Sequence, residues 1–104
     1  MEQNPKPMQE LILREALEVV MRRNALRGKA ENSFPMIADL WNTYWSTKGV
    51  KGLNSVDVAM LMVLLKVARI ARNPGDLDSY VDIAGYAACA AQCAQNEGFV
   101  KEAQ

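Results

Sequence analysis

Residues 54–98 read NSVDVAMLMVLLKVARIARNPGDLDSYVDIAGYAACAAQCAQNEG, and this stretch decides the fold. Two long apolar segments flank Asn73-Pro74-Gly75, which cannot continue a helix because proline lacks a backbone N–H and clashes with the preceding turn. Asn54 is the expected N-cap of the first helix, with Asp57 at the favourable third position. Gly98 is the residue expected just past the end of the second helix. The stretch therefore predicts an antiparallel helical hairpin.

The first helix of this hairpin is apolar around most of its circumference. We expect residues 60–68 to be the most buried part of the chain, nearly surrounded by protein. Its polar exceptions include Lys66 and Arg69, which lie on one narrow stripe, and the second helix begins by presenting Asp78 and Asp82 one turn apart. We expect these four side chains to meet at one end of the core. They form either a ligand site or a set of ion pairs that only fixes the hairpin.

Length and composition limit the possible classes of protein. The chain has 104 residues, of which 50% are hydrophobic, so one domain with one core is expected, over residues 8–98. Residues 1–7 are expected to be a disordered leader and residues 99–104 a frayed tail. Twelve basic and twelve acidic residues balance, which argues against general nucleic-acid binding. Histidine is absent from the sequence, which excludes Ser–His catalysis and ordinary zinc hydrolysis.

The N-terminus, the length of the apolar runs and the two cysteines indicate the cellular compartment of the protein. The N-terminus is polar and carries prolines, so no secretory signal is visible. The longest apolar run, residues 58–65, is far short of the roughly 20 residues that span a bilayer. Cys89 and Cys93, one helical turn apart, are interpreted as packing residues in a reducing environment rather than as half of a metal site. A cytoplasmic protein with no membrane partner is expected.

The upstream half predicts two more helices, which gives an all-α, compact four-helix domain. Residues 8–24 form an amphipathic helix, and a second helix is expected from an N-cap at Ser33, with Pro35 in its first turn, to about residue 47. The connection between them is basic, with Arg22, Arg23, Arg27 and Lys29 close together. This cluster, in particular Arg27 and Lys29, is either a phosphate grip or a solvated loop.

Glu15 and Glu18 lie on the polar face of the first predicted helix. Glu18 is four residues from both Arg14 and Arg22, and a solvated ladder of these ion pairs explains the polar face without a ligand. The alternative is that the two carboxylates hold a divalent cation such as Mg²⁺, which prefers oxygen ligands.

The last predicted helix is poor in bulky side chains. Alanine and glycine dominate residues 84–94, and a thin helix lets neighbours approach closely on every side. One small monomer hardly has enough neighbours to use all of these sides. We therefore expect a homo-oligomer with this helix near the interface.

The string DVAMLMVLLKVARIARNPGDLDSYVDIAGYAA, residues 57–88, together with ENSFPMIADLWNTYW, residues 31–45, resembles a small phage and prophage all-helical domain family of unknown function. The resemblance extends to about residue 94. Members carry a Tyr-Gly-His-Pro-like element where this chain has residues 27–30, Arg-Gly-Lys-Ala, of which only the glycine agrees.

That family is in turn distantly similar to the MazG-type all-α nucleotide pyrophosphohydrolases. These hold Mg²⁺ with an ExxE pair on one helix and an ExxD pair on a later one. The similarity implies that Glu15 and Glu18 match the first pair and that Asp82 matches the aspartate of the second. The expected glutamate is Ser79 here, with Asp78 as a substitute.

Three functions remain open from the sequence. The first is a binder that sequesters a nucleotide or a nucleotide-derived host defence signal without turnover; Lys66, Arg69 and the basic connection would hold phosphates, and Tyr86, Tyr80 or a tryptophan would stack on the base. The second is a Mg²⁺-dependent pyrophosphohydrolase that uses the four carboxylates. The third is an inhibitor that acts on a host protein by direct contact.

Overall fold

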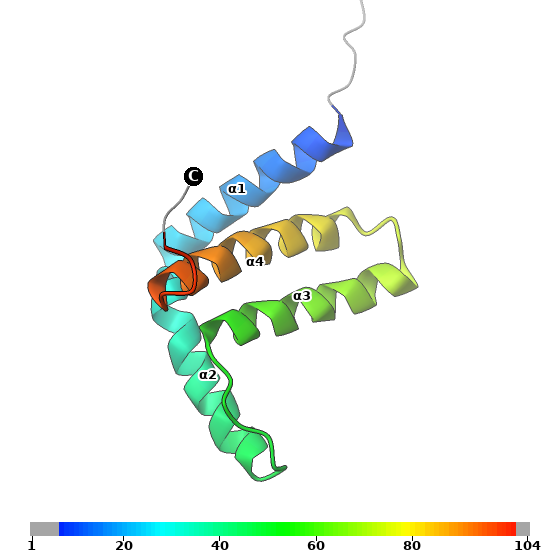
Figure 1. The fold of residues 1–104 in the computed structure, drawn as a ribbon. Helices are drawn as coiled ribbons and strands as arrows, with labels where there is room; N and C mark the ends of the chain where they lie inside the picture. The colour runs from blue at the N-terminus through cyan, green and yellow to red at the C-terminus, as the bar shows by residue number, and fades with distance from the viewer. Residues whose placement is uncertain (1–6, 102–104) are drawn as a thin grey trace, which may run out of the picture.

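The computed structural model describes residues 7–101, apart from the side chain of Arg27. Four helices follow one another in this range and no strand occurs there: α1 Met8–Arg27, α2 Ala30–Ser46, α3 Ser55–Arg72 and α4 Leu77–Asn96 (Figure 1). The predicted all-α, four-helix architecture is confirmed. The predicted disordered leader, but for residue 7, and the end of the predicted tail lie outside the described residues. Within the described range, no helix is both long enough and apolar enough to cross a membrane.

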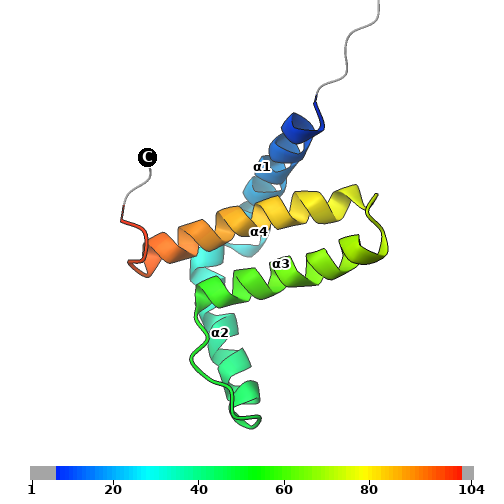
Figure 2. The ribbon, with the colours of Figure 1, turned by 45° about the vertical axis from the view of Figure 1, so that its right-hand side comes forward.

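Helices α3 and α4 form the predicted antiparallel hairpin and lie side by side in both views (Figures 1 and 2). Asn54 caps α3 with a full capping box: its side chain accepts from the Asp57 N–H at 2.9 Å, and the Asp57 carboxylate accepts from the Asn54 N–H at 2.9 Å. Gly98, at φ +86°, follows the end of α4. The N–H groups of Gly98 and Phe99 donate to Gln95 and Ala94, the paired bonds of a Schellman motif. The sequence-based boundaries of this hairpin are confirmed.

A carboxylate from beyond α4 closes the open end of the hairpin. Glu97 accepts a hydrogen bond from the backbone N–H of Ser55 at 3.1 Å and another from the Ser55 hydroxyl. Ser55 is buried, and a negative charge at the first turn of a helix is favourable. The start of α3 is thus fixed to the end of α4, 42 residues away.

The central helix is α4, which packs against each of the other three helices. Its small residues allow this: a Cβ on Gly85 would lie 3.5 Å from Cγ2 of Val20 on α1. The prediction that residues 60–68 are the most buried stretch is wrong. Only α2 and α4 pack substantially against α3, so its far side stays open, and Leu64 is 60% exposed.

The start of α2 also differs from the prediction. The helix begins at Ala30 with Lys29 at the N-cap, so Ser33 lies within it and Pro35 lies inside the helix rather than in its first turn. Because proline has no N–H, α2 lacks one backbone hydrogen bond there. The predicted basic connection shrinks to Gly28 and Lys29, with Gly28 at φ +80°.

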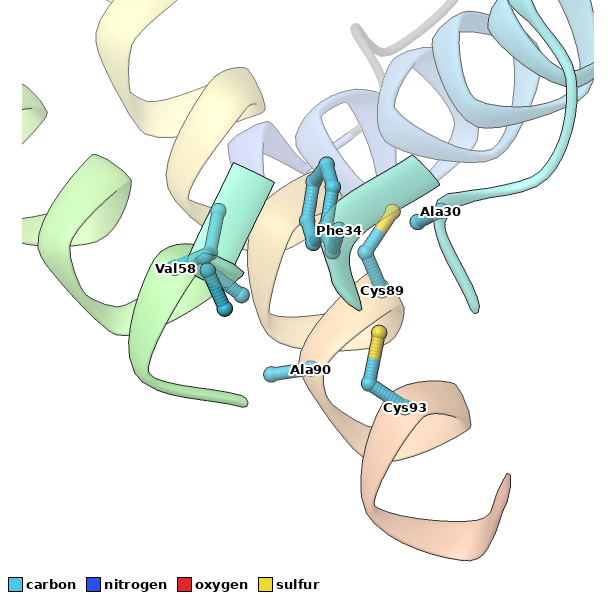
Figure 3. Packing of buried hydrophobic residues seen from close by; sticks show 8 residues of the cluster. Ala30, Phe34, Val58, Cys89, Ala90 and Cys93 are labelled. Carbon is cyan, nitrogen blue, oxygen red and sulfur yellow. The ribbon is translucent and has the colours of Figure 1, made fainter. Parts of the chain in front are cut away.

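The core is small and lies where α2 crosses α3 and α4. Phe34 is its largest buried side chain, and the other buried members are smaller (Figure 3). The remaining members are Ala30, Ala38, Val58, Ala59, Cys89, Ala90 and Cys93. The segment between α2 and α3 runs back along α2 (Figures 1 and 2). The Asn42 side chain fixes it by exchanging two hydrogen bonds of 2.9 Å with the backbone of Leu53.

Candidate functional site

The predicted charge cluster is only partly assembled. Lys66 Nζ lies 3.0 Å from Asp82 Oδ2, and the two side chains are 13% and 24% exposed. Arg69 and Asp78 are both exposed, and in the part of the chain that the structure describes no ion pair joins them to this cluster or to each other. The structure therefore brings together one cation and one carboxylate of the predicted four.

Arg23, which the sequence groups with the basic connection, lies on α1. Its guanidinium lies 4.9 Å from the centre of the Phe34 ring, a cation–π geometry. Its Nη1 atom is buried and has no hydrogen-bond partner among the described residues. A buried guanidinium nitrogen with unused donors is uncommon, because each unsatisfied donor costs about 1–3 kcal/mol.

Arg23 and Asp82 line the same small hollow between α1 and α4. The hollow has a volume of about 50 Å³, and Val19, Gly85 and Tyr86 are among its other walls. Asp82 also pairs with Lys66 of α3, but Arg23 is the cation that lines the hollow itself. Arg23, Asp82 and Lys66 together carry a net formal charge of +1, and Glu31 adds a negative charge that acts on Cys89, another wall of the hollow.

The other sequence-predicted ligand residues lie in different places. Tyr86 is half-buried and packs against the core as well as lining the hollow. The Tyr80 hydroxyl donates to the Pro74 carbonyl at 2.8 Å, at the hairpin turn. Lys29 is exposed. Arg27 ends α1, and its side chain lies outside the described part of the structure.

The predicted metal ligands are not gathered into one group. Glu15 and Glu18 are exposed on α1, and Asp78 is exposed on α4. Among the described residues, no three His, Cys, Asp or Glu side chains are placed to share a metal ion. Of the four predicted carboxylates, Asp82 of α4 is the one that lines the hollow between α1 and α4. The Mg²⁺ site stays a prediction.

Cys89 and Cys93 are free and buried in the core (Figure 3). Burial raises the pKa of both thiols above the ordinary value of 9.0, although Arg23 acts in the opposite direction on Cys89 and the Ser55 hydroxyl does so on Cys93. Neutral, enclosed thiols are inert. The structure agrees with the interpretation of these cysteines as packing residues.

The fold and the site define a small all-α domain, built on a thin central helix, with a small hollow between α1 and α4 that contains an arginine and an aspartate. The chain belongs to the DUF6378 family, a domain of unknown function, which it matches over residues 11–94.

Two phage proteins are similar to the chain. The Gene 55 protein of Mycobacterium phage D29 is 39% identical over 83 residues, which cover 79% of this chain and 52% of that protein. The Gene 55 protein of Mycobacterium phage L5 is 42% identical over 77 residues, which cover 73% of this chain and 47% of that protein. The chain thus spans about half the length of the curated relatives it matches. No solved structure matches it significantly. The phage part of the predicted resemblance agrees with these relatives, and the distant similarity to MazG-type enzymes stays a prediction.

Proposed function

We propose that the chain is a non-catalytic binding protein for a phosphate-bearing ligand of the nucleotide class. The observation that carries the proposal is the buried Nη1 of Arg23, which has no hydrogen-bond partner among the described residues. An oxyanion is the natural partner of a guanidinium with free donors, because the hydrogen bonds are charge-assisted. A phosphate oxygen at this nitrogen satisfies the buried donor.

The size of the hollow sets how such a ligand enters. A volume of about 50 Å³ holds one or two water-sized groups, since a water occupies ~30 Å³. One phosphate oxygen therefore enters beside Arg23, while the remainder of the ligand stays outside. Lys66, paired with Asp82 at 3.0 Å, supplies the second positive charge. Tyr86 of α4 lines the hollow and is the aromatic side chain on which the base would stack.

Calorimetry with inorganic phosphate and with mono-, di- and cyclic nucleotides tests the proposal. Arg23→Met and Lys66→Met should each weaken binding at least about tenfold, the loss expected for one charge-assisted hydrogen bond. Arg69→Met is the matched control and should bind as the wild type does, because Arg69 is exposed and away from the hollow. The proposal fails if no phosphate compound gives heat, or if only Arg69→Met weakens binding.

A Mg²⁺-dependent pyrophosphohydrolase remains the alternative for the same hollow. It is favoured by the position of Asp82, one of the four predicted metal ligands, on the wall of the hollow. Dependence on Mg²⁺ distinguishes the hydrolase from the non-catalytic binder. A hydrolase needs Mg²⁺ for turnover and loses it in Glu18→Gln, whereas a binder retains intact ligand in EDTA.

A second alternative function is inhibition of a host protein by direct contact, through a surface on α2 that is separate from the hollow. Trp41, Tyr44, Trp45 and Leu61 line a hollow of about 290 Å³ at the outer end of α2, and the two tryptophan rings lie 6.1 Å apart. Large aromatic side chains are typical of the residues that dominate protein–protein binding. Binding of a host protein that is lost in Tyr44→Ala and retained in Arg23→Met would support this function.

A further inference from the structure

We propose that the hollow between α1 and α4 takes a phosphate that carries a proton, and therefore binds phosphate monoesters in preference to diesters and sulfate. Arg23 donates a hydrogen bond to one phosphate oxygen, and the P–OH group of the same phosphate donates to the carboxylate of Asp82. The inference rests on the proposed function and names the class of phosphate that this one site accepts.

A donor and an acceptor line the hollow without bonding to each other. Arg23 of α1 and Asp82 of α4 are both wall residues, yet no ion pair joins them in the part of the chain that the structure describes. Arg23 Nη1 is buried and has no hydrogen-bond partner among those residues. A group that enters the hollow satisfies both walls only if it accepts a hydrogen bond on one side and donates one on the other.

Asp82 keeps one oxygen for such a group. Its Oδ2 atom lies 3.0 Å from Lys66 Nζ on α3, and among the described residues no hydrogen bond is made to its Oδ1 atom. A carboxylate can only accept. A fully ionised phosphate or sulfate would bring an oxygen without a proton against this carboxylate, whereas a P–OH group would form a charge-assisted hydrogen bond to it.

The charges around the hollow match one negative charge on the ligand better than two. The titratable residues there are Arg23 on α1, Glu31 on α2, Lys66 on α3, and Asp82, Tyr86 and Cys89 on α4. Arg23, Lys66 and Asp82 sum to +1, and the negative charge of Glu31 acts on Cys89. Burial raises the pKa of the Cys89 thiol, so this side chain adds no charge at neutral pH. A phosphate monoanion therefore balances the three charges, and a dianion exceeds them.

Monoesters and diesters differ in the one group that this arrangement needs. A phosphate monoester has a second pKa of about 6, so below that pH it keeps a P–OH group. A diester also carries one negative charge, but its second free oxygen would face Asp82 without a proton between them. We therefore expect the terminal phosphate of a nucleoside monophosphate to bind in the hollow, and cyclic nucleotides to be excluded from it.

Methyl phosphate, dimethyl phosphate and sulfate are the probes, and NMR titrations of the full chain, followed by backbone amide shifts, measure the dissociation constants. At about pH 5.5 the two esters carry nearly the same charge and differ mainly in OH against OCH₃. Methyl phosphate should bind at least about tenfold more tightly than dimethyl phosphate or sulfate, the difference expected for one charge-assisted hydrogen bond.

The affinity for methyl phosphate should also depend on pH, because the monoanion is the bound form. Between about pH 5.5 and pH 7.5 the monoanion fraction falls roughly 25-fold, so the dissociation constant should rise by that factor. Dimethyl phosphate keeps one charge throughout and should bind equally at both pH values. The chain contains no histidine, the side chain that ordinarily titrates in this range, so the change reports the proton on the ligand.

Asp82→Asn tests the carboxylate, because an amide can donate to an oxygen that carries no proton. This variant should bind sulfate at least about tenfold more tightly than the wild type does and should lose the pH dependence for methyl phosphate. Asp78→Asn is the matched control one turn earlier on α4, where the carboxylate is exposed, and it should keep the wild-type selectivity. Circular dichroism reports whether each variant is folded, and the wild-type titrations decide the inference by themselves if Asp82→Asn is not.

Selective and pH-dependent binding of methyl phosphate supports the inference. If dimethyl phosphate or sulfate binds as tightly as methyl phosphate, and Arg23→Met loses this binding, the inference is overturned while the proposed phosphate binding stands. The inference is also overturned if folded Asp82→Asn keeps the selectivity and the pH dependence of the wild type. If none of the three probes shifts the amides around the hollow, the proposed function itself fails, and the inference fails with it.

Discussion

Replacing Arg23 with methionine tests whether its guanidinium, whose Nη1 has no hydrogen-bond partner among the described residues, is retained for a ligand at the expense of the fold. The substitution removes a buried donor without a partner, which costs about 1–3 kcal/mol in the native state. It also removes the contact of the guanidinium with the Phe34 ring, 4.9 Å away, which is worth about 0.5–1 kcal/mol at a half-exposed site. Methionine is flexible enough to pack in the same space.

The expected net result is a ligand-free protein that is about 1 kcal/mol more stable than the wild type, with a Tm about 4 °C higher. Urea and thermal unfolding followed by circular dichroism measure the change. Arg22→Met, at an exposed neighbour, should stay within about 0.5 kcal/mol of the wild type. Added phosphate should stabilise the wild type and leave Arg23→Met unchanged. A loss of more than about 1 kcal/mol in Arg23→Met would refute the reasoning, because it would show that Arg23 serves the fold.

Three further predictions concern stability. Asn54→Ala should lower the free energy of unfolding by about 1 kcal/mol, the usual cost of a lost N-cap, in urea titrations. Lys66→Met should cost about 2 kcal/mol, since it leaves Asp82 half-buried without its partner; a double-mutant cycle with Asp82→Asn should return a coupling of at least about 0.5 kcal/mol. Burial raises the pKa of the Cys89 and Cys93 thiols above 9.0, so the native state disfavours the thiolates. The stability due to neutral thiols is therefore complete below pH 9.0 and falls as the pH rises further. Unfolding titrations across this range should show a flatter decline in the double alanine variant, and an identical decline would contradict the prediction.

Features set by neighbours in the sequence were predictable. The capping box of Asn54, the turn at residues 73–75 and the C-terminal Gly98 each depend on a few adjacent residues whose backbone preferences act locally. The start of α2 was misplaced because Ser33 followed by Pro35 fits a helix start. The structure accommodates this proline inside α2, where the tertiary contacts of Ala30 and Phe34 extend the helix towards its N-terminus.

The arrangement of the helices was not predictable from composition. Residues 60–68 are apolar apart from Lys66, which favours a central position for α3. The thin α4 is central instead, because its small side chains let three helices approach it. The buried Nη1 of Arg23 was also missed, because Arg23 was grouped with the cations of the predicted loop. A signal was present: Ala16, Val19, Val20 and Arg23 follow at i, i+3, i+4 and i+7, which places a charge on the apolar stripe of α1.

The carboxylate of Glu97 on the start of α3 has a consequence for how the molecule opens. With the turn at one end and this contact at the other, the hairpin is closed at both ends and should exchange its amide hydrogens as one cooperative unit. Helix α1 has no comparable tie in the described part of the chain and packs mainly against α4. Its amides should therefore exchange through a separate opening of lower free energy. The hollow has one wall on α1 and the other on α4, so it should widen whenever α1 separates from α4.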